Sequence, residues 1–133
     1  MIAVESQKKV NMMLTNVRPF PENPLYYALG KSLSQVQKEY TERQPRASKV
    51  YLVDDLLIYR CWGVLNKAEL QLVAEDPEGA RMVQELLEQQ WNSLKAVVQA
   101  TVQDHLGCRA LGVSVTFNPE QDELVILCRV VRT

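Results

Sequence analysis

The chain has 133 residues, 47% of them hydrophobic, and a formal net charge of −1, so it is long enough to bury the core of one domain. The near-neutral charge and the absence of a basic run argue against nucleic-acid binding, and no stretch approaches the roughly twenty apolar residues that a membrane span needs. The N-terminus lacks a secretion signal and the three cysteines are widely spaced, which predicts a reducing, cytoplasmic location.

Residues 1–23 show no sustained periodicity, and Pro19 and Pro21 favour an extended path. We expect this segment to be a flexible N-terminal arm and residues 24–133 to form a single α+β domain. The domain is expected to start with a helix that Asn23 caps, since apolar side chains recur there at three- and four-residue spacing: Tyr26, Leu29, Leu33, Val36 and Tyr40.

Residues 50–62 (VYLVDDLLIYRCW) predict a β-hairpin whose two-residue turn, Asp54-Asp55, pairs Val53 with Leu56. Side chains alternate across a strand, so this register defines two faces. The face expected to meet the helices is uncharged: Val50, Leu52, Leu57, Tyr59 and Cys61. The outer face is a large apolar surface between basic residues: Lys49, Tyr51, Val53, Leu56, Ile58, Arg60 and Trp62. A register shifted by one residue is the alternative, and it buries Trp62 and exposes Cys61.

After a short helix in residues 66–74, one long helix is predicted from Pro77 to Leu106, with Asp76 as its cap and Gly107 closing it in the left-handed conformation. About thirty residues at 1.5 Å each give roughly 45 Å, whereas a strand of about eight residues spans about 27 Å. We therefore expect the long helix to extend beyond the sheet and to leave apolar surface uncovered.

A second hairpin is predicted in residues 109–131 across Asn118-Pro119, with Val115 opposite Leu124 and Val113 opposite Ile126. This register places Leu111, with Val113 and Val115, on the helix-facing side. The predicted fold class is α+β, in two layers: a four-stranded antiparallel sheet made of two β-hairpins, backed by one long and two shorter helices. The predicted element order is α-β-β-α-α-β-β.

The sequence contains no convincing catalytic or metal site, and we expect no enzymatic activity and no cofactor. His105 is the only histidine and lies beside the apolar stripe, so a packed, hydrogen-bonded histidine is favoured over a catalytic base. Cys108 lies three residues later, but no orienting group accompanies it. The carboxylates of Asp54 and Asp55 suit a tight turn better than a metal.

The sequence resembles a bacterial family of unknown function in residues 49–69 and 77–89. The most specific part of this resemblance is the strand–Asp-Asp-Leu–strand unit followed by Gly63-Val64-Leu65. That family is also named for the C component of a sodium-translocating, membrane-potential-generating system (MpsC), and the resemblance runs from about Leu25 to Val130. It implies a cytosolic accessory subunit of a membrane system. Similar small proteins of carbon-fixing photosynthetic bacteria suggest a carboxysome assembly chaperone that holds a tail of a shell protein.

Two functions are therefore open: a non-enzymatic adaptor or assembly chaperone that binds a short peptide or tail of a protein partner, and an accessory subunit of the membrane system. In both functions the apolar surface binds another protein. We expect neither nucleic-acid binding nor direct insertion into a membrane. A homodimer is predicted, because two-fold association is the commonest way to cover such surface. The candidate dimer or partner-binding residues are Tyr51, Val53, Leu56, Ile58, Trp62, Tyr26 and Leu33.

Overall fold

The computed structural model describes residues 24–132, so the predicted N-terminal arm lies outside the described residues. The predicted α+β class and element order are confirmed. The elements in chain order are α2 (Pro24–Thr41), β1 (Ala47–Val53), β2 (Leu56–Trp62), α3 (Lys67–Glu75), α4 (Pro77–Asn92), α5 (Lys95–Leu106), β3 (Arg109–Asn118) and β4 (Glu123–Val131).

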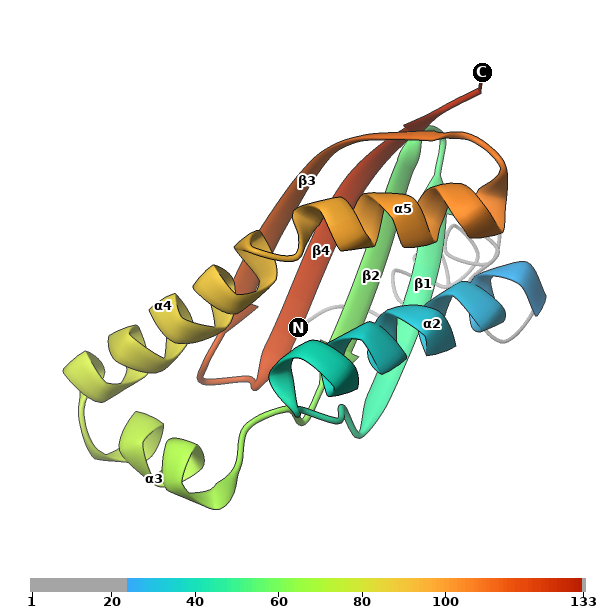
Figure 1. The fold of residues 1–133 in the computed structure, drawn as a ribbon. Coiled ribbons are helices and arrows are strands. Elements are labelled where there is room, and N and C mark those ends of the chain that lie inside the picture. Colours follow the sequence, from blue (N-terminus) through green and yellow to red (C-terminus); the bar gives the residue numbers. More distant parts are fainter. Residues whose placement is uncertain (1–23, 133) are drawn as a thin grey trace, which may run out of the picture.

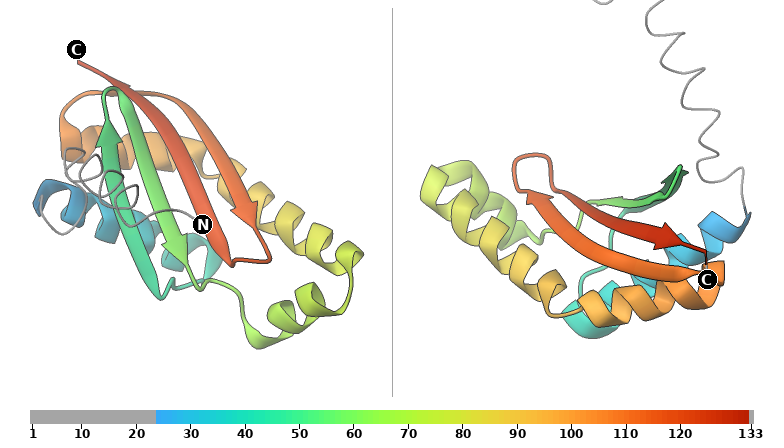
Figure 2. Two further views of the ribbon diagram at one scale, coloured as in Figure 1. Left: turned by 180° about the vertical axis from the view of Figure 1, so that it is seen from behind. Right: turned by 90° about the horizontal axis from the view of Figure 1, so that it is seen from above.

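The four strands form one antiparallel sheet in the order β1-β2-β4-β3, so the second hairpin joins the first through its last strand. The helices α2, α4 and α5 all lie against the same face of this sheet, while α3 and the start of α4 project beyond its end (Figure 1). Seen from behind, the opposite face has no helix of the described chain over it (Figure 2). The domain therefore has two layers and one uncovered sheet face.

The core lies between the sheet and the helices, where apolar side chains from both layers meet. Leu29 and Leu33 of α2, Leu87 and Trp91 of α4, and Val102 of α5 are each at most 1% exposed. Their helical spacing places them on one stripe of each helix, as the periodicity predicts. The helix-facing strand residues Val50, Leu57, Tyr59, Cys61, Val113, Phe117, Leu124, Ile126 and Cys128 complete this core.

The single long helix predicted from Pro77 to Leu106 is wrong in one respect, because the structure divides it into α4 and α5 at Ser93-Leu94. The Ser93 hydroxyl donates to the Gln90 carbonyl oxygen at 2.6 Å, and the Leu94 N–H donates to the Trp91 carbonyl oxygen at 2.9 Å. Such local bonds compete with regular helical bonds and end a helix. The predicted ends are correct: the Asp76 carboxylate caps the first turn, and Gly107 is left-handed.

The second hairpin differs from the prediction by a two-residue shift and a bulge. Val115 lies opposite Ile126 and Val113 opposite Cys128, and the period-two alternation keeps these four residues on the helix-facing side. An irregularity between Leu111 and Val113, with Gly112 at a φ of 56°, reverses the alternation beyond it. Consequently Leu111 was wrongly placed on the helix-facing side: it is 36% exposed, and Ala110 is buried instead.

Candidate functional site

The first hairpin has the predicted register, with Val53 opposite Leu56 and Tyr51 opposite Ile58. Cys61 is fully buried, and Trp62 is only partly buried on the outer face, so the register shifted by one residue is excluded. The predicted separation of an uncharged buried face from an apolar outer face therefore holds in this hairpin, and the outer face is the candidate site.

Strand pairing extends the outer face across the whole sheet. One cross-strand row contains Tyr51, Ile58, Leu127 and Ser114, and its first three side chains make an apolar centre. The rows on either side combine charged residues with further aliphatic and aromatic side chains. On one side, the next row contains Lys49, Arg60, Val125 and Thr116, and the row after it contains Trp62 and Glu123. On the other side, the row contains Val53, Leu56, Arg129 and Leu111. An apolar centre with a charged rim is typical of a protein interface.

The two arginines of this face, Arg60 and Arg129, are both ion-paired. Arg60 donates to the Glu123 carboxylate at 2.7 Å, and its guanidinium lies 4.5 Å from the centre of the Trp62 ring. Arg129 pairs with Asp55 of the β1–β2 turn at 2.8 Å. Stacking on Arg60 restrains the Trp62 ring, and a pre-ordered aromatic–arginine pair is the kind of group that contributes most to binding at interfaces.

The two candidate residues of α2 have different positions. Leu33 is 1% exposed, so its assignment as a partner-binding residue is wrong: it lies on the stripe of α2 that packs into the core. Tyr26, in the first turn of α2, is partly exposed. It lines a groove of about 690 Å³ at one end of the sheet, which we call the end groove, with Leu52, Asp54, Leu106, Cys108 and Val130 as further lining residues.

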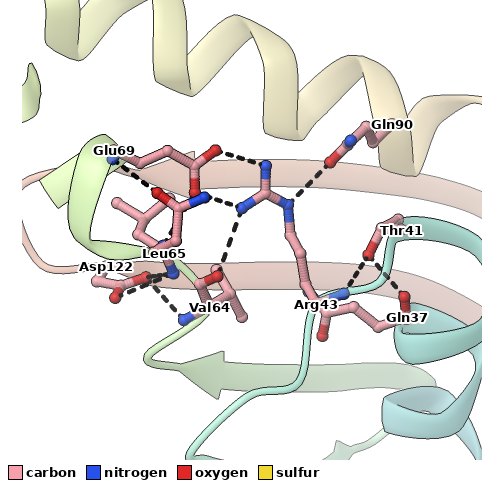
Figure 3. Close-up of polar contacts among 9 residues, drawn as sticks. Gln37, Thr41, Arg43, Val64, Leu65, Glu69, Gln90 and Asp122 are labelled. Carbon is pink, nitrogen blue, oxygen red and sulfur yellow. Dashed lines mark hydrogen bonds and ion pairs between the residues drawn. The ribbon is translucent and has the colours of Figure 1, made fainter.

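A polar cluster at the opposite end of the sheet was not predicted from the sequence (Figure 3). The two terminal nitrogens of the Arg43 guanidinium, Nη1 and Nη2, each donate to the Glu69 carboxylate at 2.7 Å. The third nitrogen, Nε, donates to the Gln90 side-chain oxygen at 3.1 Å. The Asp122 carboxylate accepts from the backbone N–H groups of Val64 and Leu65 at 3.0 and 3.2 Å. The cluster therefore ties the segments around α3 to α4 and to the β3–β4 turn.

Only one weak signal of this cluster is present in the sequence. Glu69 stands three residues after Asn66, the spacing of a capping box, which the structure contains. Asp122 precedes a strand, but nothing local indicates that it is buried at a φ of 49°. Arg43 lies in a polar connection between α2 and β1, and its partners are 26 and 47 residues away in the chain. Such distant pairings become visible only in the fold.

The single histidine is hydrogen-bonded within the fold, and the Cys61 thiol is buried in the core. His105 is hydrogen-bonded as predicted, through Nε2 to the Ser32 hydroxyl and through Nδ1 to the Thr101 carbonyl oxygen, both at 3.0 Å. Burial raises the pKa of the Cys61 thiol to about 12, so the nucleophilic thiolate is not formed near neutral pH. Residues 24–132 contain no group of three side chains placed to hold a metal ion.

None of the helices in the described part of the chain is both long and apolar enough to cross a membrane. Among known families, the model described as "Na+-translocating membrane potential-generating system (MpsC)" matches residues 25–131. No curated protein and no solved structure matches the chain.

Proposed function

The chain belongs to the MpsC family, and from this premise we propose that it is a non-enzymatic accessory subunit of a membrane-potential-generating system that binds a protein partner through the outer face of its sheet. The family model covers nearly all of the described residues, including both hairpins. A part in such a system requires association with another protein, because no described helix is suited to spanning a bilayer.

The observation that carries the proposal is the uncovered outer face. Its centre is formed by Tyr51, Ile58 and Leu127, and no helix among residues 24–132 packs on it (Figure 2). Apolar surface removed from water contributes about 25 cal/mol per Å², so covering this face with a partner is favourable. Open apolar faces rimmed by charge mark interaction sites on proteins.

A second copy of the chain is the first partner to consider. A two-fold dimer places the same patch of each protomer against the other, and the central row of Tyr51, Ile58 and Leu127 is suited to such self-complementary packing. The start of α4 does extend beyond the sheet, as predicted for the long helix, but α3 packs against it there. The proposed homodimer therefore uses the outer face, so that a second copy and the membrane partner compete for the same surface.

The matched variants Ile58→Asp and Leu86→Asp test the proposal. Both introduce a carboxylate in place of an aliphatic side chain, but Ile58 lies at the centre of the outer face and Leu86 is 45% exposed on α4. Tagged full-length chains are used to capture partners from detergent-solubilised membranes of the source cells. We expect the wild type and Leu86→Asp to retain the same membrane subunit and Ile58→Asp to lose it.

Equal capture by all three chains contradicts the outer face as the binding site. Capture of shell-type proteins by their tails, with no membrane subunit, contradicts the accessory role and supports the assembly-chaperone prediction, which stays open to this experiment.

A further inference from the structure

The end groove lies where four parts of the fold meet: the first turn of α2, the β1–β2 turn, the end of α5 and the end of β4. Its floor is formed largely by aliphatic side chains, Leu52, Leu106 and Val130 among them. Tyr26 and the partly buried Cys108 are also in its lining. We propose that the occupant of this groove is the chain's own segment 10–17 (VNMMLTNV), bound intramolecularly.

The point where the described chain begins supports this occupant. The segment 1–23 joins the structure at Pro24, and Leu25 and Tyr26, the next two residues, line the groove. Nine residues separate Leu14 from Pro24, and at most about 3.3–3.6 Å per residue allows the connection to span roughly 30 Å. For comparison, α5, whose end lines the groove, has twelve residues and an expected length of about 18 Å, which is shorter than this span. Segment 10–17 can therefore reach any part of the groove from Pro24, at the start of α2.

The composition of the segment fits the lining. Met12, Met13 and Leu14 form the apolar run of residues 1–23 that lies nearest to Pro24 in the sequence; the other run is Met1 to Val4. Methionine side chains are unbranched and adapt to irregular apolar surfaces, and the groove combines aliphatic, aromatic and thiol groups in its lining.

The charges at the groove add a second point of agreement. Lys8 and Lys9 directly precede the segment. Asp54 and Asp55 both line the groove, and Asp55 is held by Arg129. Within the described residues Asp54 has no ion pair, so its carboxylate can receive a lysine at the N-terminal end of the bound segment. Arg132 also lines the groove and makes the local charge balanced rather than strongly acidic.

Cys108 supplies a direct readout, because Cys61 and Cys128 are buried while Cys108 is only partly buried and lines the groove. The experiment measures the rate at which a maleimide modifies Cys108 in the folded full-length chain, with the modified peptide identified by mass spectrometry. Three chains are compared: the wild type, the triple variant Met12→Asp/Met13→Asp/Leu14→Asp, and the control Asn11→Asp/Thr15→Asp/Asn16→Asp. The control adds the same charge to the same segment but keeps its apolar run.

We expect modification of Cys108 to be faster by about tenfold or more in the apolar-to-Asp variant, since the groove is then open, and to stay within about twofold of the wild type in the control. The wild-type rate is expected to be independent of protein concentration. Equal rates in all three chains overturn the proposal. Protection that grows with protein concentration also overturns it, because the occupant is then the segment of a second copy.

Discussion

The two faces of the sheet come from the same strands and differ in what covers them. Each face has a tryptophan beside it: Trp91 of α4 is 0% exposed and packs 6.5 Å from the Tyr59 ring, whereas Trp62 is partly exposed and stacks on Arg60. The covered face of the first hairpin is uncharged, whereas the outer face carries charged residues, among them the ion-paired Arg60 and Arg129. Apolar character alone thus does not distinguish core from interface; the neighbouring charges do.

The largest difference between the two faces is expected when each tryptophan is replaced by alanine and the losses in the free energy of unfolding are compared. Trp91→Ala leaves a large cavity in the core, so we expect it to lower the free energy of unfolding by about 3–5 kcal/mol. Trp62→Ala is expected to lower it by about 1 kcal/mol or less, since the ring loses mainly its contact with Arg60. Chemical denaturation of both variants measures the difference. Equal losses contradict the assignment of the two faces.

The polar cluster at the end of the sheet is also expected to stabilise the fold, and the variant Asp122→Ala tests its contribution. Removing the carboxylate leaves the buried N–H groups of Val64 and Leu65 without their acceptor, at a cost of about 1–3 kcal/mol. Asp122→Asn keeps an acceptor oxygen and tolerates the positive φ, so it is the matched control and is expected to lose less. If both variants unfold at the same denaturant concentration, hydrogen bonding by Asp122 does not stabilise this end.

A smaller effect is expected from pH. The hydrogen bond from Arg43 lowers the pKa of Glu69 below its ordinary value of 4.5. A carboxyl whose folded-state pKa is lowered stabilises the fold above its unfolded pKa, and this contribution is lost as the pH falls through the folded-state value. We therefore expect the wild type to lose stability below about pH 4.5 more steeply than Glu69→Gln, as thermal unfolding at a series of pH values would measure. Parallel curves for the two chains contradict this role of the ion pair.

The sequence predicts well what depends on periodicity and local signals. The faces of the first hairpin follow from alternation and a two-residue turn, and the helix ends at Asp76 and Gly107 follow from capping. The errors arise where a local irregularity alters a period. The Ser93-Leu94 break divides a continuous apolar stripe without a proline to announce it, and the bulge at Gly112 turns Leu111 outward.

The candidate site was predictable only in part, for the same reason. Five of its seven proposed residues lie on the outer face because one register defines that face. Leu33 was misplaced because an apolar residue on an amphipathic helix carries no local sign of which neighbour it meets. The additions from β4, Leu127 and Val125, depend on β2 pairing with β4, a contact between segments more than sixty residues apart.

The most direct test of the outer face as a protein-binding surface is sedimentation velocity of the wild type, Ile58→Asp and Leu86→Asp at a series of concentrations, with denaturation curves to show that all three are folded. If the outer face forms the proposed homodimer, the wild type and Leu86→Asp sediment as dimers and Ile58→Asp as a folded monomer. A wild-type monomer at tens of micromolar, about the range in which weak dimers are detected, together with unchanged capture of the membrane partner by Ile58→Asp, would contradict the account.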